Sequence, residues 1–153
     1  MPALQLTLSA IVALLLVAAA IVDWRKREIP EWVNIGIAIA AVPMWWATGL
    51  TLWPGLAVQL GVAIAAFAVF TGVWMLGQMG GGDVKLITVL ALFFAPIDFV
   101  GMLVVMAIAG GVLTLVMVVD YRLRPRETPF ENPYGIAIAF AGLWILAERY
   151  LNQ

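Results

Sequence analysis

Two aspartates, Asp23 and Asp83, are the residues of this sequence best placed to do chemistry. Asp23 is the first acid after an apolar N-terminal segment, and Asp83 follows three glycines at the border of another apolar segment. Moving an aspartate toward hydrocarbon costs about 2.5–3.5 kcal/mol even on lenient scales, so such residues normally face a polar cavity or the membrane interface. Two carboxylates at membrane borders therefore suggest a pair that shares a proton.

A close pair of carboxylates has a defined chemistry. The two groups cannot both ionise easily, so one stays protonated near neutral pH while the other acts as a base. A water held between them can be deprotonated and directed at a peptide carbonyl, while the protonated partner hydrogen-bonds the developing oxyanion. This is aspartic peptidase chemistry, and it uses no histidine or cysteine, both of which this sequence lacks. The sequence predicts no metal and no cofactor.

The composition is that of an integral membrane protein. Hydrophobic residues make up 65% of the chain and charged residues 11%, against about 25% charged residues in soluble domains. The 153 residues predict one transmembrane peptidase domain over residues 1–153. A net charge of -1 offers no basic surface for nucleic acid, so the lipid bilayer is the expected partner.

Apolar runs separated by charged or turn residues predict an all-α bundle of about six transmembrane helices. The expected spans are residues 4–22, 33–48, 54–76, 84–95, 99–119 and 134–147. A helix perpendicular to the membrane needs about 20 residues to cross it, so the fourth span is too short. Either that helix continues past Pro96, or the glycine segment before it lies below the membrane surface beside protein or a water-filled cavity.

The basic residues predict the orientation of these spans. With six spans, the first, third and fifth loops share one side of the membrane and hold seven of the eight Lys and Arg residues. By the positive-inside rule these loops are cytoplasmic, and both termini lie outside the cytoplasm. Asp23 and Asp83 are then expected on the same cytoplasmic side. The basic residues that directly follow the first span also favour its retention over cleavage as a signal peptide.

Three segments carry a resemblance to a known family. They are Asp23-Trp24-Arg25-Lys26-Arg27-Glu28-Ile29-Pro30, then Gly80-Gly81-Gly82-Asp83-Val84-Lys85-Leu86, and finally Pro133-Tyr134-Gly135-Ile136-Ala137. In this order, and with six expected spans, the chain resembles the type IV prepilin peptidases, particularly the short forms associated with Flp-type (tad) pili. The glycine-aspartate motif alone is a weak signal, whereas the three segments together are specific.

The resemblance implies a GxGD aspartic endopeptidase of the bacterial inner membrane, with its active site near the cytoplasmic face. Such an enzyme cuts the leader of a prepilin just after a glycine, and the residues that match its catalytic pair are Asp23 and Asp83. The implied substrate has a short basic leader followed by an apolar helix in the bilayer. Longer family members that also methylate the new N-terminus carry an added domain with paired cysteines, so N-methyltransferase activity is not expected here.

The glycines before Asp83 have two interpretations. Gly80, Gly81 and Gly82 can form a turn or a close-packing surface. They also allow the backbone to approach a bound extended peptide, which could pair with it as an added strand. Lys85 is interpreted first as a positive-inside residue that extends toward the interface, with tuning of Asp83 or contact with substrate as the alternative.

The third segment is expected to shape the site. Pro133, Tyr134 and Gly135 could be a plain helix start, because proline suits the first turn, but the resemblance implies that they pack near the aspartates. One position departs from the family pattern, because Glu31 follows Pro30 where asparagine is frequent. No role is carried over to Glu31.

Other interpretations stay open at this stage. Asp120 also ends an apolar span on the cytoplasmic side, so topology alone does not exclude it as a partner of Asp83, whereas Asp98 falls on the opposite face. The same acids would serve a small proton- or cation-coupled transporter or channel, although no acid lies in the middle of a span. A noncatalytic membrane assembly subunit is a further alternative, and there either aspartate should tolerate asparagine.

Overall fold

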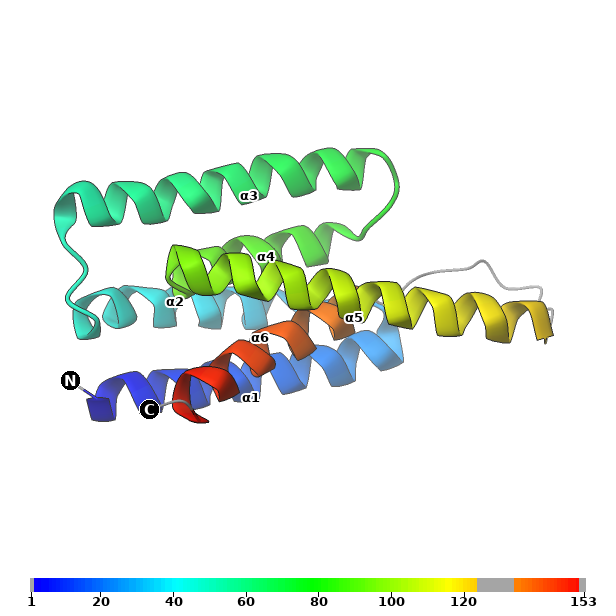
Figure 1. The fold of residues 1–153 in the computed structure, drawn as a ribbon, viewed down its shortest axis with the longest axis horizontal. Helices are drawn as coiled ribbons and strands as arrows, with labels where there is room; N and C mark the ends of the chain where they lie inside the picture. The colour runs from blue at the N-terminus through cyan, green and yellow to red at the C-terminus, as the bar shows by residue number, and fades with distance from the viewer. Residues whose placement is uncertain (1, 124–133, 152–153) are drawn as a thin grey trace.

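The computed structural model describes residues 2–123 and 134–151, and every regular element within these ranges is a helix. The elements in chain order are α1 (Pro2–Lys26), α2 (Glu31–Ala47), the short π-helix η1 (Leu52–Leu56), α3 (Ala57–Met75), α4 (Gly81–Phe93), α5 (Pro96–Leu123) and α6 (Tyr134–Leu151). They form one elongated bundle (Figure 1). The predicted all-α class is confirmed, and each expected span corresponds to one helix.

Four helices in the described part of the chain are long and apolar enough to cross a membrane. They are α1, the continuous unit of η1 and α3, α5 as far as Asp120, and α6. The protein is therefore a multi-pass membrane protein. α2 and α4 are shorter, at 17 and 13 residues, so a count of six spans and the location of both termini outside the cytoplasm remain predictions.

The shortest helix, α4, lies inside the bundle. It ends at Phe93, and Pro96 already begins α5, so the possibility that this helix continues past Pro96 was wrong. Phe94 has an extended backbone, so the chain leaves the helical conformation two residues before Pro96. Leu86, Ile87 and Leu90 are fully buried because α4 packs chiefly against α3 and α2.

A helix that ends inside a membrane bundle needs donors for its last carbonyl groups. The buried Gln59 side chain on α3 supplies them, because its Nε2 lies 2.7 Å from the Ala91 oxygen and 2.6 Å from the Phe94 oxygen. The Trp45 indole N–H on α2 donates to the Leu92 oxygen at 2.7 Å. These two side chains therefore cap the C-terminal end of α4 from neighbouring helices.

Replacing Gln59 with leucine is expected to lower the free energy of unfolding by about 1–3 kcal/mol, because buried carbonyls at the end of α4 lose their donor. Thermal unfolding of the purified protein in detergent micelles measures this change. Gln78→Leu is the control, since Gln78 is exposed. Equal melting temperatures for the Gln59 variant and the wild type would contradict the capping role.

One end of the bundle collects the segments that the sequence singled out. The C-terminal end of α1 and the N-terminal ends of α2, α4 and α6 lie at the end opposite both chain termini (Figure 1). α5 extends past the other helices at this same end (Figure 1). Residues far apart in the chain, in particular the end of α1 and the start of α4, thus come together there.

Candidate active site

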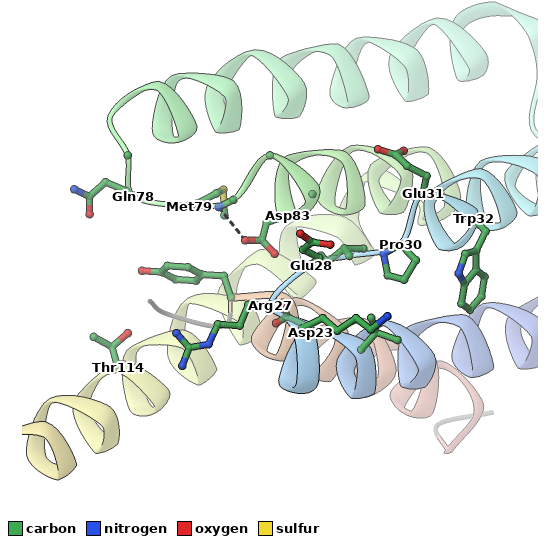
Figure 2. Close-up of a pocket in the computed structure, with 18 residues that line it drawn as sticks. Asp23, Arg27, Glu28, Pro30, Glu31, Trp32, Gln78, Met79, Asp83 and Thr114 are labelled. Carbon is green, nitrogen blue, oxygen red and sulfur yellow. Dashed lines mark hydrogen bonds between the residues drawn. The ribbon is translucent and has the colours of Figure 1, made fainter. Parts of the chain in front are cut away.

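A cavity of about 1060 Å³ opens at this end of the bundle. Its walls come from the end of α1, the α1–α2 connection, the α3–α4 turn, the start of α4, and one residue each of α5 and α6. The lining residues are 22–23, 26–32, 77–83, Thr114 and Tyr134. Asp23 and Asp83 therefore line the same cavity, and Figure 2 shows the Asp83 carboxylate extending from α4 toward the end of α1, where Asp23 lies.

Asp83 is held by the first turn of α4. Its Oδ2 atom accepts a hydrogen bond from the Gly80 backbone N–H at 3.1 Å, and a helix N-terminus favours a carboxylate. Asp83 lies outside the four helices long enough to span the membrane and is 6% exposed. Burial is the largest cause that raises the pKa of Asp83 to about 7; the Gly80 N–H opposes this change and the neighbouring Asp23 carboxylate adds to it. The protonated form is therefore populated near neutral pH.

Asp23 lies in the last turns of α1 and faces the start of α6. It is 4% exposed, and the backbone N–H groups of Gly135 and Ile136 act on its carboxylate as hydrogen-bond donors. These are among the first N–H groups of α6, which have no partner within their own helix. The buried Oδ2 atom has no hydrogen-bond partner among the described residues, so it can accept a bond from a water or a substrate.

Close packing of α1 against α6 places Asp23 in this position. A Cβ atom on Gly135 would lie 2.7 Å from Oδ2 and 2.8 Å from Cγ of Asp23. Two turns along α6, a Cβ atom on Gly142 would lie 2.8 Å from a Leu16 methyl group. Only glycine permits both approaches without displacement, because glycine has no Cβ. The two glycines thus set the spacing of α1 and α6 beside the cavity.

The glycine segment before Asp83 is less of a loop than the sequence indicated. Gly81 and Gly82 already belong to α4, and Gly80 precedes the helix in an extended conformation. A Cβ atom on Gly82 would approach Ile29 to 3.2 Å, so this glycine lets α4 pack against the α1–α2 connection. Pairing of all three glycines with a substrate strand is therefore wrong, since helical backbone cannot join a sheet ladder.

The remaining predicted site residues lie at different distances from the cavity. Tyr134 lines it, whereas Pro133 lies outside the described residues. Lys85 does not line the cavity and forms an ion pair with Glu31, which does. Both side chains are more than half exposed, at 52% and 63%, so the pair is expected to contribute little to stability.

The competing acids lie elsewhere. Asp120 is exposed on α5 and does not line the cavity, and Asp98 lies in the first turn of α5, away from it. Thr114 on α5 does line the cavity, although the sequence analysis did not single it out. Its signal is a lone hydroxyl in the otherwise apolar run of residues 110–119.

Metal ligands do not cluster in the part of the chain that the structure describes. Within residues 2–123 and 134–151, no three side chains from histidine, cysteine, aspartate and glutamate form a group that could hold a metal ion. The cavity does contain carboxylates, backbone N–H groups and a hydroxyl. These groups can bind water, transfer a proton and bind a polar backbone.

The fold and the cavity together describe a helical membrane protein with two buried acidic side chains at one site. In a comparison with protein families, residues 10–119 match the type IV leader peptidase family. This chain belongs to that family, and the predicted family resemblance is confirmed. Asp23 and Asp83 lie within the matched range, and Gly135 lies beyond it. Comparisons with curated proteins and with solved structures gave no match.

Proposed function

We propose that this protein is an aspartic endopeptidase that removes the leader of type IV prepilins of the Flp-like class after a glycine. The observation that carries the proposal is the placement of Asp23 and Asp83, both buried and on different helices, in the lining of one cavity. Family membership supports peptide cleavage. A pair of acids of this kind suits hydrolysis by an activated water.

The two aspartates have different surroundings, which assigns them different roles. The Oδ2 atom of Asp23 is buried and has no hydrogen-bond partner among the described residues, so we assign Asp23 as the base that binds the attacking water and removes its proton. Asp83 keeps its proton below its pKa of about 7, and the protonated form donates a hydrogen bond to the oxygen of the scissile carbonyl. The water oxygen attacks the carbonyl carbon, and the C–N bond then breaks as Asp23 returns its proton to the leaving amine.

The substrate fits the surroundings of the cavity. Its basic leader would approach past Glu28 in the lining, since Glu31 is already paired with Lys85, and its apolar helix would stay in the bilayer. Arg25 and Lys26 in the last turn of α1, with Arg27 directly after it, favour a cytoplasmic location for this end of the bundle. The proposed location is the bacterial inner membrane, with the cavity near the cytoplasmic face.

Cleavage in reconstituted membranes tests the proposal directly. The wild-type protein in liposomes, supplied with a candidate prepilin, should release a leader peptide, and mass spectrometry of the product should place the cut after a glycine. Intact precursor for every prepilin tested, together with proton uptake that depends on Asp23 and Asp83, would favour the transporter alternative. Absence of both leader release and proton uptake in the wild-type protein would favour a noncatalytic assembly subunit.

The cleavage rate is expected to fall as the pH rises through about 7, the pKa of Asp83. A raised pKa means that the protonated form is present below this value and lost above it, and the proposed mechanism needs that proton. Well above pH 7 the rate should decline about tenfold per pH unit, as for a single essential acid. Single-turnover cleavage between pH 5 and 9 measures the profile, and a constant rate up to pH 9 would contradict the assignment of Asp83 as the acid.

A further inference from the structure

An apolar groove runs along the outer surface between α5 and α6. It has a volume of about 630 Å³ and is lined by six residues of α5, from Val105 to Val116, and four of α6, from Ile136 to Trp144. Every one of these side chains is aliphatic or aromatic, and the indole N–H of Trp144 is the one side-chain polar group among them. Several are widely exposed, including Ile108 at 64% and Phe140 at 50%.

The groove and the cavity with the two aspartates are lined by neighbouring residues of α5 and α6. Leu113 in the groove directly precedes Thr114 in the cavity, and Ile136 in the groove follows two residues after Tyr134 in the cavity. The backbone N–H of Ile136 also acts on Asp23. One elongated ligand can therefore occupy the groove and extend into the cavity.

The two helices approach each other closely along this boundary. A Cβ atom on Gly110 would lie 3.7 Å from the Tyr134 ring and 3.8 Å from the Ala137 side chain, so α5 contacts one residue of the cavity and one of the groove. α5 is also the least buried of the four candidate spans, and it continues past the end of the bundle (Figure 1). Its outer face is thus open to a ligand within the bilayer.

We propose that this groove binds the apolar helix of the substrate, with the residues just before that helix reaching Asp23 and Asp83. The inference rests on the proposed function and adds the surface that selects the substrate. From Val105 to Val116 the α5 wall covers about 16 Å at the helical rise, which matches roughly three turns of a bound helix. Helices in a bilayer associate through packing of apolar and small side chains, and the groove includes Ala109 and Ala137.

The continuity of groove and cavity favours this occupant over a lipid chain or a second copy of the protein. A lipid chain would gain nothing from a connection to the aspartates. A substrate with an apolar helix and an adjoining cut site needs both surfaces in this order. Its bound helix would fix the distance between the bilayer and the scissile bond, which places that bond at the two carboxylates.

A pair of matched substitutions tests the groove in a cleavage assay. Ile108 and Ile64 are 64% and 68% exposed, but only Ile108 lines the groove, while Ile64 lies on α3. Ile108→Trp is expected to lower kcat/KM for both substrates to different extents. The decrease for the full precursor should be about tenfold larger than the decrease for a soluble peptide that contains only the leader and the cut site. Ile64→Trp is expected to change neither value. Equal effects of the two substitutions, or equal effects on the two substrates, would overturn the proposal.

Photo-crosslinking separates failure of the groove from failure of the proposed function. In an Asp83→Asn background, Ile108 or Ile64 is replaced by p-benzoylphenylalanine and the protein is reconstituted with the precursor. Crosslinks from position 108 to the apolar helix of the precursor, and none from position 64, would support the groove. Crosslinks only to lipid, only to a second copy, or equally from both positions would overturn it. If position 108 crosslinks the precursor but the wild type leaves it uncut, the proposed function fails while the binding surface stands.

Discussion

Replacing either Asp23 or Asp83 with asparagine is expected to abolish prepilin cleavage. Asparagine keeps the size of aspartate but can neither accept the proton of the attacking water nor supply an acidic proton to the carbonyl oxygen. Loss of a positioned acid or base costs about 10²–10⁴-fold in rate. Because the two acids act as one unit, the double variant should be no slower than the slower single variant. Cleavage of the precursor in membranes, with leader release followed over time, measures these rates.

Asp120→Asn is the matched control for this experiment. Asp120 is an acid near the same end of the bundle, but it is exposed and outside the cavity, so its replacement should leave the rate within about twofold of the wild type, an effect below 0.5 kcal/mol. All variants must be compared at equal amounts of folded protein. Full activity of Asp23→Asn or Asp83→Asn would contradict the proposed two-aspartate mechanism. Loss of activity in Asp120→Asn would indicate that Asp120 acts as a partner of Asp83.

Much of the architecture could be predicted from the sequence because membrane helices leave a strong signal. Long apolar runs ended by charges or prolines located all six helices, and the short fourth run already indicated an unusual element. The same reasoning placed Asp23 and Asp83 at one end of the bundle, which the structure also does. These inferences depend on the lengths of the apolar runs and on the positions of the charged residues, and both can be read from a single sequence.

The contacts of individual atoms could not be predicted in this way. Gln59 was not among the residues predicted to have a role, and only the fold shows that it caps α4 at Ala91 and Phe94. The lone hydroxyl of Thr114 in an apolar run was a weak signal, because its place in the cavity depends on how α5 packs against the other helices. The sequence left the glycines before Asp83 open between a turn, a close-packing surface and contact with an extended peptide, whereas the structure places Gly81 and Gly82 in the first turn of α4.

Gly135→Ala is expected to inactivate the enzyme, although it adds only one methyl group. The new Cβ atom would lie 2.7 Å from Oδ2 and 2.8 Å from Cγ of Asp23, inside normal contact distance. Asp23 is short and buried, so relief requires either rotation of its carboxylate or movement of the start of α6. Either change moves the base away from its water and from the amides of Gly135 and Ile136. A misplacement of about 1 Å can cost about 10²-fold in rate.

Gly142→Ala separates this effect from a general loosening of the α1–α6 contact. Gly142 lies on the same helix and also faces α1. Its Cβ atom, however, would contact the flexible end of the Leu16 side chain at 2.8 Å, and that end can rotate away. We expect a loss of thermal stability with a kcat close to the wild-type value for Gly142→Ala, and a fall in kcat well beyond any loss of stability for Gly135→Ala. Parallel declines of kcat and melting temperature in both variants would mean that Gly135 acts only through packing. A selective fall in kcat instead identifies the start of α6 as the element that positions Asp23.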